Sequence, residues 1–249
     1  ATPNDFGRMG AIPTHPELLD WLAVEFRDGG DWLESQSMKS LHRLIVTSSV
    51  YRQSSTSSAT NAAIDGSNQF LWRMSRRRLE AEEIRDSILQ VSGTMNPKMG
   101  GPGYYLFQLE RTAHSPHYEY HKFDPNDAAS HRRSIYRFIV RSQPDPWMTT
   151  LDCADSSQST PRRNETLTSL QALSLLNSRF SLVMAEKFVT RVEKQAAGLE
   201  EQVRLAASLV MQREPSQQES KMLIAYARQH GLNNLCRFLF NLSEFVYLD

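Results

Sequence analysis

Three histidines and two aspartates lie close together in the middle of the chain, in the stretch ERTAHSPHYEYHKFDPND at residues 110–127. The histidines are His114, His117 and His121, and the aspartates are Asp124 and Asp127. Neutral imidazole nitrogens at about 2.0–2.1 Å and carboxylate oxygens are ligands that a zinc-like ion accepts. These residue types therefore permit a divalent metal at His114, His117, His121 and Asp124. Its bound water, with a pKa near 7, would be the nucleophile of a hydrolase.

The spacing of the histidines matches no standard metal motif. On a helix all three would share a face, but Pro116 interrupts the run, and a residue before proline favours extended or turn backbone. On a strand, His117 and His121 share a face while His114 does not. The alternative is a rigid loop in which tyrosine and histidine side chains pack and hydrogen-bond through their polar tips.

Two pairs of adjacent arginines lie beside predicted loops. Guanidinium groups bind carboxylates and phosphates through two parallel hydrogen bonds, which makes these pairs candidates for an anionic ligand. With two tyrosines they form our set of candidate ligand-binding residues: Arg132, Arg133, Arg162, Arg163, Tyr118 and Tyr120. The alternative is structural, with the arginines tying their loops to Asp152, Asp155 and neighbouring carboxylates.

A second basic run, from Arg73 to Arg78, precedes an acidic run, from Glu80 to Glu83. Opposite charges three or four residues apart stabilise a helix, so ion pairs along one helix are the expected use of these residues. Cys153 lies between acidic residues, which would raise the pKa of its thiol and leave it a poor nucleophile. Cys153 and Cys236 could form a disulfide or remain free thiols, and no CxxCH motif for haem attachment is present.

The elements that must position these residues are mainly helical. A capping box at Thr14–Glu17 predicts a helix up to Gly29. Apolar residues at helical spacing predict further helices: from Ser37, through residues 79–93, and over most of the chain from Asn164 onward. In the first helix after Asn164, we expect an inward-facing stripe of leucines: Leu167, Leu170, Leu173 and Leu176. Residues 52–67 are polar and rich in turn formers, which predicts a long loop.

Two short aromatic and branched segments, YYLFQL at 104–109 and SIYRFIV at 134–140, predict strands on either side of the histidine stretch. The expected fold is therefore one mainly helical domain over residues 1–249, with a small two-stranded β insert at about residues 104–141. Lys and Arg number 28, as do Asp and Glu. The resulting zero net charge argues against nucleic-acid binding driven by overall charge. No apolar run approaches the 20 residues that a membrane helix needs.

Several long strings resemble one family: the C-terminal domain of unknown function in large secreted, planctomycete-type proteins. They span almost the whole chain: TPNDFGRMGAIPTHPELLDWLA, MKSLHRLIVTSSVYRQSS, LWRMSRRRLEAEEIRDSIL, HSPHYEY, HRRSIYRFIVRSQPDPWMTTLDCAD, RRNETLTSLQALSLLNSRF and NLCRFLFNLSEFVYLD. The resemblance implies a helical fold, an extracytoplasmic location and a parent protein with an upstream cytochrome-c-like domain. It also implies that the chain is a C-terminal fragment. It supplies no catalytic residues.

We draw three functional hypotheses from these observations. The first is an accessory or interaction domain that docks to upstream domains, a partner or a glycan, using aromatic residues at 104, 105, 118, 120 and 147. The second is a metal-assisted hydrolase centred on His114–His121. The third is a docking face for electron transfer with the cytochrome-c-like domain, in which this chain binds no cofactor itself.

Overall fold

The computed structural model describes residues 2, 4–5, 7–111 and 115–248. Their contacts divide the chain into two compact units, residues 1–77 and residues 78–248. The expectation of a single domain stays a prediction, because two compact units can still fold together. Among the described residues, no helix has the length and apolar character needed to cross a membrane.

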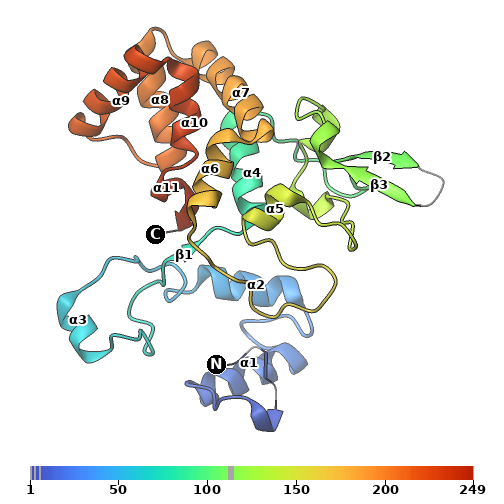
Figure 1. The fold of residues 1–249 in the computed structure, drawn as a ribbon. Coiled ribbons are helices and arrows are strands. Elements are labelled where there is room, and N and C mark those ends of the chain that lie inside the picture. Colours follow the sequence, from blue (N-terminus) through green and yellow to red (C-terminus); the bar gives the residue numbers. More distant parts are fainter. Residues whose placement is uncertain (1, 3, 6, 112–114, 249) are drawn as a thin grey trace. The chain divides into compact units, whose positions relative to one another are not determined.

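The first unit contains short helices (Figure 1). They bury little of their apolar surface. They are η1 (Gly7–Met9), α1 (Pro16–Asp28), α2 (Met38–Thr47) and α3 (Ala59–Ile64). None of these helices contains a buried residue. Leu18 and Leu19 of α1 are half exposed.

Two predictions for this unit are wrong in detail. The N-cap of α1 is His15 without a side-chain cap, because the Thr14 hydroxyl contacts the His15 ring and not the helix backbone. The predicted loop at 52–67 contains α3, whose first turn is capped by the Ser58 side chain. A serine in the turn-rich sequence therefore starts a helix.

The second unit has its core among α4 (Ala81–Ser92), α7 (Arg179–Gln195) and the C-terminal helices (Figure 1). The C-terminal helices are α8 (Leu199–Met211), α9 (Gln217–His230), α10 (Leu232–Leu239) and α11 (Ser243–Val246). In α4, the predicted stripe of Ala81, Ile84, Ile88 and Val91 is buried, and a Glu80–Glu83 capping box begins the helix. The mainly helical fold is thus confirmed.

The leucine stripe predicted for α6 (Ser169–Asn177) is wrong. Leu167, Leu170 and Leu173 are 82%, 63% and 54% exposed, whereas Leu175 is only 2% exposed and joins the core. Gln171, a polar residue, lies on the buried side with it. A polar group can be buried there because its side chain is hydrogen-bonded, as described below.

The β insert is confirmed, but its first strand overlaps the predicted segment 104–109 only at residues 108–109, and its second strand is not the one predicted. Strand β2 (Gln108–Arg111) pairs antiparallel with β3 (Pro116–Glu119), with Gln108 opposite Glu119. The segment predicted as the second strand instead contains the 3-10 helix η4 (Ser134–Tyr136), followed by an isolated bridge between Tyr104 and Arg137. The histidine stretch therefore contributes a strand of the hairpin and does not link two strands.

Three further elements connect the insert to the helices. They are η2 (Tyr120–Lys122), η3 (Ala128–Ser130) and α5 (Pro146–Thr150). Strand β1 (Arg77–Arg78) forms a second small sheet with β4 (Tyr247–Leu248). The Arg73–Arg78 run precedes α4, so these arginines do not lie on one helix with the acidic run as predicted.

Candidate functional site

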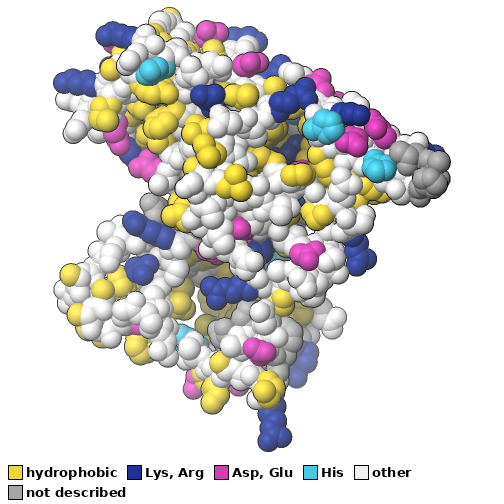
Figure 2. Space-filling model, in the orientation of Figure 1, with side chains coloured by type: hydrophobic (Ala, Val, Ile, Leu, Met, Phe, Trp, Pro, Cys, Tyr) yellow, Lys and Arg dark blue, Asp and Glu magenta, His cyan; other side chains and the backbone are white. Residues whose placement is uncertain are grey.

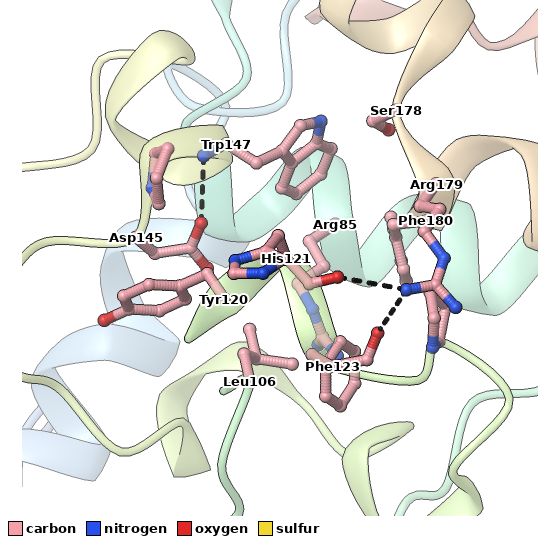
Figure 3. Close-up of a pocket in the computed structure, with 12 residues that line it drawn as sticks. Arg85, Leu106, Tyr120, His121, Phe123, Asp145, Trp147, Ser178, Arg179 and Phe180 are labelled. Carbon is pink, nitrogen blue, oxygen red and sulfur yellow. Dashed lines mark hydrogen bonds between the residues drawn. The ribbon is translucent and has the colours of Figure 1, made fainter. Parts of the chain in front are cut away.

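A pocket lies in the second unit where η2, α5 and α7 meet (Figure 3). Its volume is about 270 Å³. Known ligand pockets span about 300–1,000 Å³, so this one suits a single ring-sized group better than a larger ligand. Figure 2 shows hydrophobic side chains gathered between α7 and the hairpin, with histidine side chains toward the hairpin.

The walls of the pocket are mostly aromatic and come from separate parts of the chain. Trp147 of α5 packs against Phe180 of α7, with ring centroids 5.2 Å apart. Tyr120, Phe123 and Leu106 complete the apolar lining (Figure 3). The indole Nε1 of Trp147 is buried and has no hydrogen-bond partner among the described residues.

Arg85 places a positive charge against this lining. Its side chain is 1% exposed, and the guanidinium lies 5.3 Å from the centre of the Phe180 ring and 5.1 Å from that of Tyr104. It donates hydrogen bonds to the carbonyls of Ser130 and Arg132. Burial lowers the pKa of Arg85, since the charged form is poorly solvated there. Its carbonyl partners hold the guanidinium in a fixed place.

Asp145 supplies the one carboxylate among the described lining residues. Its Oδ1 accepts hydrogen bonds from the backbone N–H groups of Trp147, at 2.9 Å, and Met148, at 3.3 Å, which caps α5. Burial raises the pKa of this carboxyl, although Arg137 and Arg85 oppose the shift. The carboxyl therefore has less tendency to be charged than an ordinary aspartate.

Tyr120 and His121 are the two predicted site residues that lie in the pocket. The Tyr120 hydroxyl donates to the Gln143 carbonyl, and burial raises its pKa to about 12, so this phenol is not a base at neutral pH. The His121 ring contacts a Glu119 carboxylate oxygen at 3.1 Å. The carbonyls of His121 and Phe123 both accept from Arg179 Nη1 at 3.1 Å (Figure 3).

The remaining members of the predicted metal set lie apart from the pocket lining. His117 is exposed on β3 opposite Glu110, and Asp124 is exposed, with hydrogen bonds from Asn126. His114 lies outside the described residues. Within residues 2–111 and 115–248, so far as the structure describes them, no group of three or more His, Cys, Asp or Glu side chains could hold a metal.

The predicted arginine pairs make contacts within the protein. Arg132 donates to the carbonyls of Lys98, Gly100 and Pro102 and stacks 4.0 Å above the Tyr136 ring. Arg133 lies 3.7 Å from Asp86, while Arg162 is exposed. A ligand-binding role for these residues stays a prediction.

Arg163 forms ion pairs with Glu80 and Glu82, and Glu82 also accepts from the Cys153 thiol. Burial and the nearby Glu82 raise the pKa of Cys153 to about 11. Cys236, which is buried, has its pKa raised to about 12. Both cysteines are free thiols, and neither environment activates a nucleophile.

Tyr118 packs edge-on against Phe107 at 5.0 Å between ring centroids, as part of a cluster that includes Tyr120 and Phe138. The notion that Tyr104 is exposed for interaction is wrong, since it is 5% exposed. Its ring lies against the Arg85 guanidinium instead. Sequence reasoning missed Arg85, Asp145, Arg179 and Phe180 as pocket residues. The only signal was Asp145-Pro146, which is typical of a helix N-terminus.

A comparison with known families gives one match, covering residues 1–227. The chain belongs to PSD1, a family of proteins of unknown function (DUF1553). No curated protein and no solved structure matches the chain. Membership of the PSD1 family confirms the resemblance to a family of unknown function and assigns no activity to the pocket.

Proposed function

We propose that this PSD1-family chain is a binding domain without catalytic activity, and that the pocket between α5 and α7 accepts one sugar ring of a glycan. The observation that carries the proposal is an aromatic pocket of about 270 Å³ with an arginine and an aspartate fixed at its walls. Sugar rings have apolar C–H faces and polar edges. Aromatic walls suit the faces, and fixed polar groups suit the hydroxyls.

The polar groups of the pocket are better suited to binding than to catalysis. Asp145 Oδ1 already accepts two backbone hydrogen bonds, and Tyr120 donates to a carbonyl. A glycoside hydrolase commonly needs two carboxyl groups at the bond that breaks, about 5–9.5 Å apart. Among the described lining residues, Asp145 is the single carboxylate. The lining therefore supports recognition of a sugar and not its hydrolysis.

The wider setting of this binding domain follows from the family resemblance alone. We propose that it belongs to a larger extracytoplasmic protein and brings a glycan close to the other domains of that protein. An upstream cytochrome-c-like domain remains part of this proposal, as does docking to it.

The test is binding of methyl glycosides of glucose, galactose, mannose and N-acetylglucosamine to the full chain, measured by saturation-transfer NMR and calorimetry. We expect binding with dissociation constants near the millimolar range, and no release of sugar from the matching disaccharides. Trp147→Phe should keep the wall but weaken binding, while Trp147→Ala should cost about 1 kcal/mol more, because one stacking contact is lost.

Trp32→Ala is the matched control, because Trp32 is 66% exposed and belongs to the other unit. Circular dichroism would show that each variant keeps its helical content. No binding to any of these glycosides, to glucuronate or to sulfated glucose would overturn the proposal. Turnover of a disaccharide that is lost in Asp145→Asn would overturn the non-catalytic part.

A further inference from the structure

The charges around the pocket are not balanced. Arg85 and Arg179 line it with His121, against the single carboxylate of Asp145 among the described lining residues. Asp86, outside the lining, lies 4.0 Å from Arg85 and offsets its charge, so the excess positive charge rests on Arg179. A concave site with one prevailing sign of charge concentrates ligands of the opposite sign. The lining thus favours an anion over a neutral molecule.

Arg179 is the cation that a ligand can reach. Arg85 is 1% exposed and already donates to backbone carbonyls, whereas Arg179 is exposed at the start of α7. Its Nη1 donates to the carbonyls of His121 and Phe123, which holds the guanidinium beside the pocket (Figure 3). Among the described residues no carboxylate forms an ion pair with Arg179, although Arg179 contributes to the lowered pKa of Asp124.

The N-terminus of α7 adds to the positive potential beside Arg179. Ser178 caps α7, a helix of 17 residues, and both Ser178 and Arg179 line the pocket. The first turn of a helix carries a partial positive charge, which strengthens the attraction of an anion held by Arg179. A neighbouring carboxylate, Glu119, contacts the His121 ring at 3.1 Å, so His121 is not counted as a free cation of the pocket.

We infer that the preferred ligand is an acidic sugar, whose ring lies against Trp147 and Phe180 and whose anionic group binds Arg179. The inference rests on the proposed function, since it names the class of sugar at the same pocket. The shared chemistry is an oxyanion on a sugar ring, either the carboxylate of a uronate or a sulfate ester. A guanidinium binds both through parallel N–H···O hydrogen bonds.

The experiment compares methyl glucuronide, methyl glucoside 6-sulfate and neutral methyl glucoside, each titrated into the full chain by calorimetry at low and at physiological salt. We expect the charged sugars to bind about tenfold tighter than the neutral one at low salt, because a hydrogen bond to a charged group contributes about 1.5 kcal/mol. The preference should shrink at higher salt, since Arg179 is exposed. The two charged arms show whether the pocket prefers carboxylate or sulfate.

Arg179→Gln should abolish the preference for the charged sugars while neutral glucoside still binds. Arg179→Lys should reduce that preference from about tenfold to about threefold. Arg228→Gln is the matched control, an exposed arginine of α9 that pairs with Glu200, and should leave the preference unchanged. If neutral glucoside binds as tightly as both acidic sugars, this inference fails while the binding domain stands. If no sugar binds, both fail. A preference that survives Arg179→Gln also overturns the assignment to Arg179.

Discussion

Two sites in the second unit contain buried charged side chains, and the two sites differ in how those side chains are hydrogen-bonded. One is the clamp, in which Asp152 accepts hydrogen bonds from Arg78, Thr166 and Gln171. The other is the pocket, in which Asp145 and Arg85 lie at the walls of a cavity. Both carboxylates and both arginines are largely buried, so burial alone does not separate a structural site from a binding site.

The difference lies in what surrounds the charges. In the clamp, Arg78 lies 3.1 Å from Asp152, and Thr166 and Gln171 fill the remaining acceptor positions of the carboxylate. This closes the loop at 153–165, whose two ends are thereby joined. In the pocket, Asp145 accepts the backbone hydrogen bonds of Trp147 and Met148 through Oδ1, and its side chain lines a cavity. A carboxylate whose oxygens all accept hydrogen bonds within the protein fixes a loop. A carboxylate that lines a cavity can bind a ligand.

Among the tests of this comparison, we expect the largest change in the free energy of unfolding from a substitution of Asp152. Asp152→Ala removes the carboxylate that accepts from Arg78, Thr166 and Gln171, and the Arg78 side chain is only 6% exposed. Removing one partner of a buried pair costs about 3–5 kcal/mol. Urea unfolding should show this loss, whereas Asp155→Ala, an exposed carboxylate that caps Ser157, should change stability by about 0.5 kcal/mol. Equal losses in the two variants would show that the clamp does not stabilise the fold.

The next effect concerns the helix that carries Gln171 of the clamp. Leu175→Ala empties a fully buried position and should cost about 2–5 kcal/mol in the free energy of unfolding. Leu173→Ala, on the same helix but 54% exposed, should change it by about 0.5 kcal/mol. The pair is measured by the same urea titration. A larger loss at Leu173 than at Leu175 would show that the buried face of α6 is the stripe expected from sequence.

The contrast between these leucines shows where sequence reasoning succeeded and where it failed. Helix α4 is predicted with its buried face, because its apolar residues recur at helical spacing and Gly93 lies just past its end; the structure adds a Glu80–Glu83 capping box at its start. Helix α6 was predicted with the wrong face, because leucines occupy both of its sides. Gln171, which decides the buried face, is polar and is buried only because Asp152 and Thr166 accept from it.

The pocket could not have been predicted for a similar reason. Its lining comes from five separate segments, near residues 85, 106, 120–125, 145–147 and 178–180. No one of them carries a motif, and Arg85 lies within a regular amphipathic helix where an exposed position would be the ordinary reading. Tyr120 and His121 were singled out because the histidine stretch is unusual in composition. Their role as wall residues depends on tertiary contacts with α5 and α7.

A smaller effect should appear in the pH dependence of stability. Burial raises the pKa of Asp145, so its contribution to stability is fully present below the unfolded pKa, about 3.9, and is lost as pH rises through the folded pKa. Arg85 and Arg137 oppose this loss, and Asp86 adds to the negative charge nearby. Asp145→Asn keeps an N-cap amide oxygen and removes the ionisation. The variant should therefore gain stability relative to the parent chain between pH 4 and pH 7.

Asp124→Asn is the matched control with the opposite sign. Hydrogen bonds from Asn126 lower the pKa of Asp124, so its contribution is present above the unfolded pKa and is lost as pH falls. Relative to the parent, this variant should be less stable at pH 4 and at pH 7, and its deficit should shrink as pH falls below about 3.9. Free energies of unfolding at about pH 2.5, 4 and 7 give both differences. If Asp145→Asn shows the sign of Asp124→Asn, the carboxyl of Asp145 is stabilised in its charged form and the assigned direction of its pKa shift is wrong.

The smallest effect that we expect is the change in Tm when divalent metal is removed. His121 contacts Glu119 and His117 lies on the exposed face of β3, so the described part of the histidine stretch does not gather three ligands at one point. Protein purified without chelator should contain zinc well below one equivalent, and EDTA should leave Tm unchanged. Stoichiometric zinc that is lost in His117→Ala and in His114→Ala, but kept in His42→Ala, would contradict this expectation. It would favour the metal-assisted hydrolase hypothesis for the histidine stretch, because a bound metal supplies a water nucleophile.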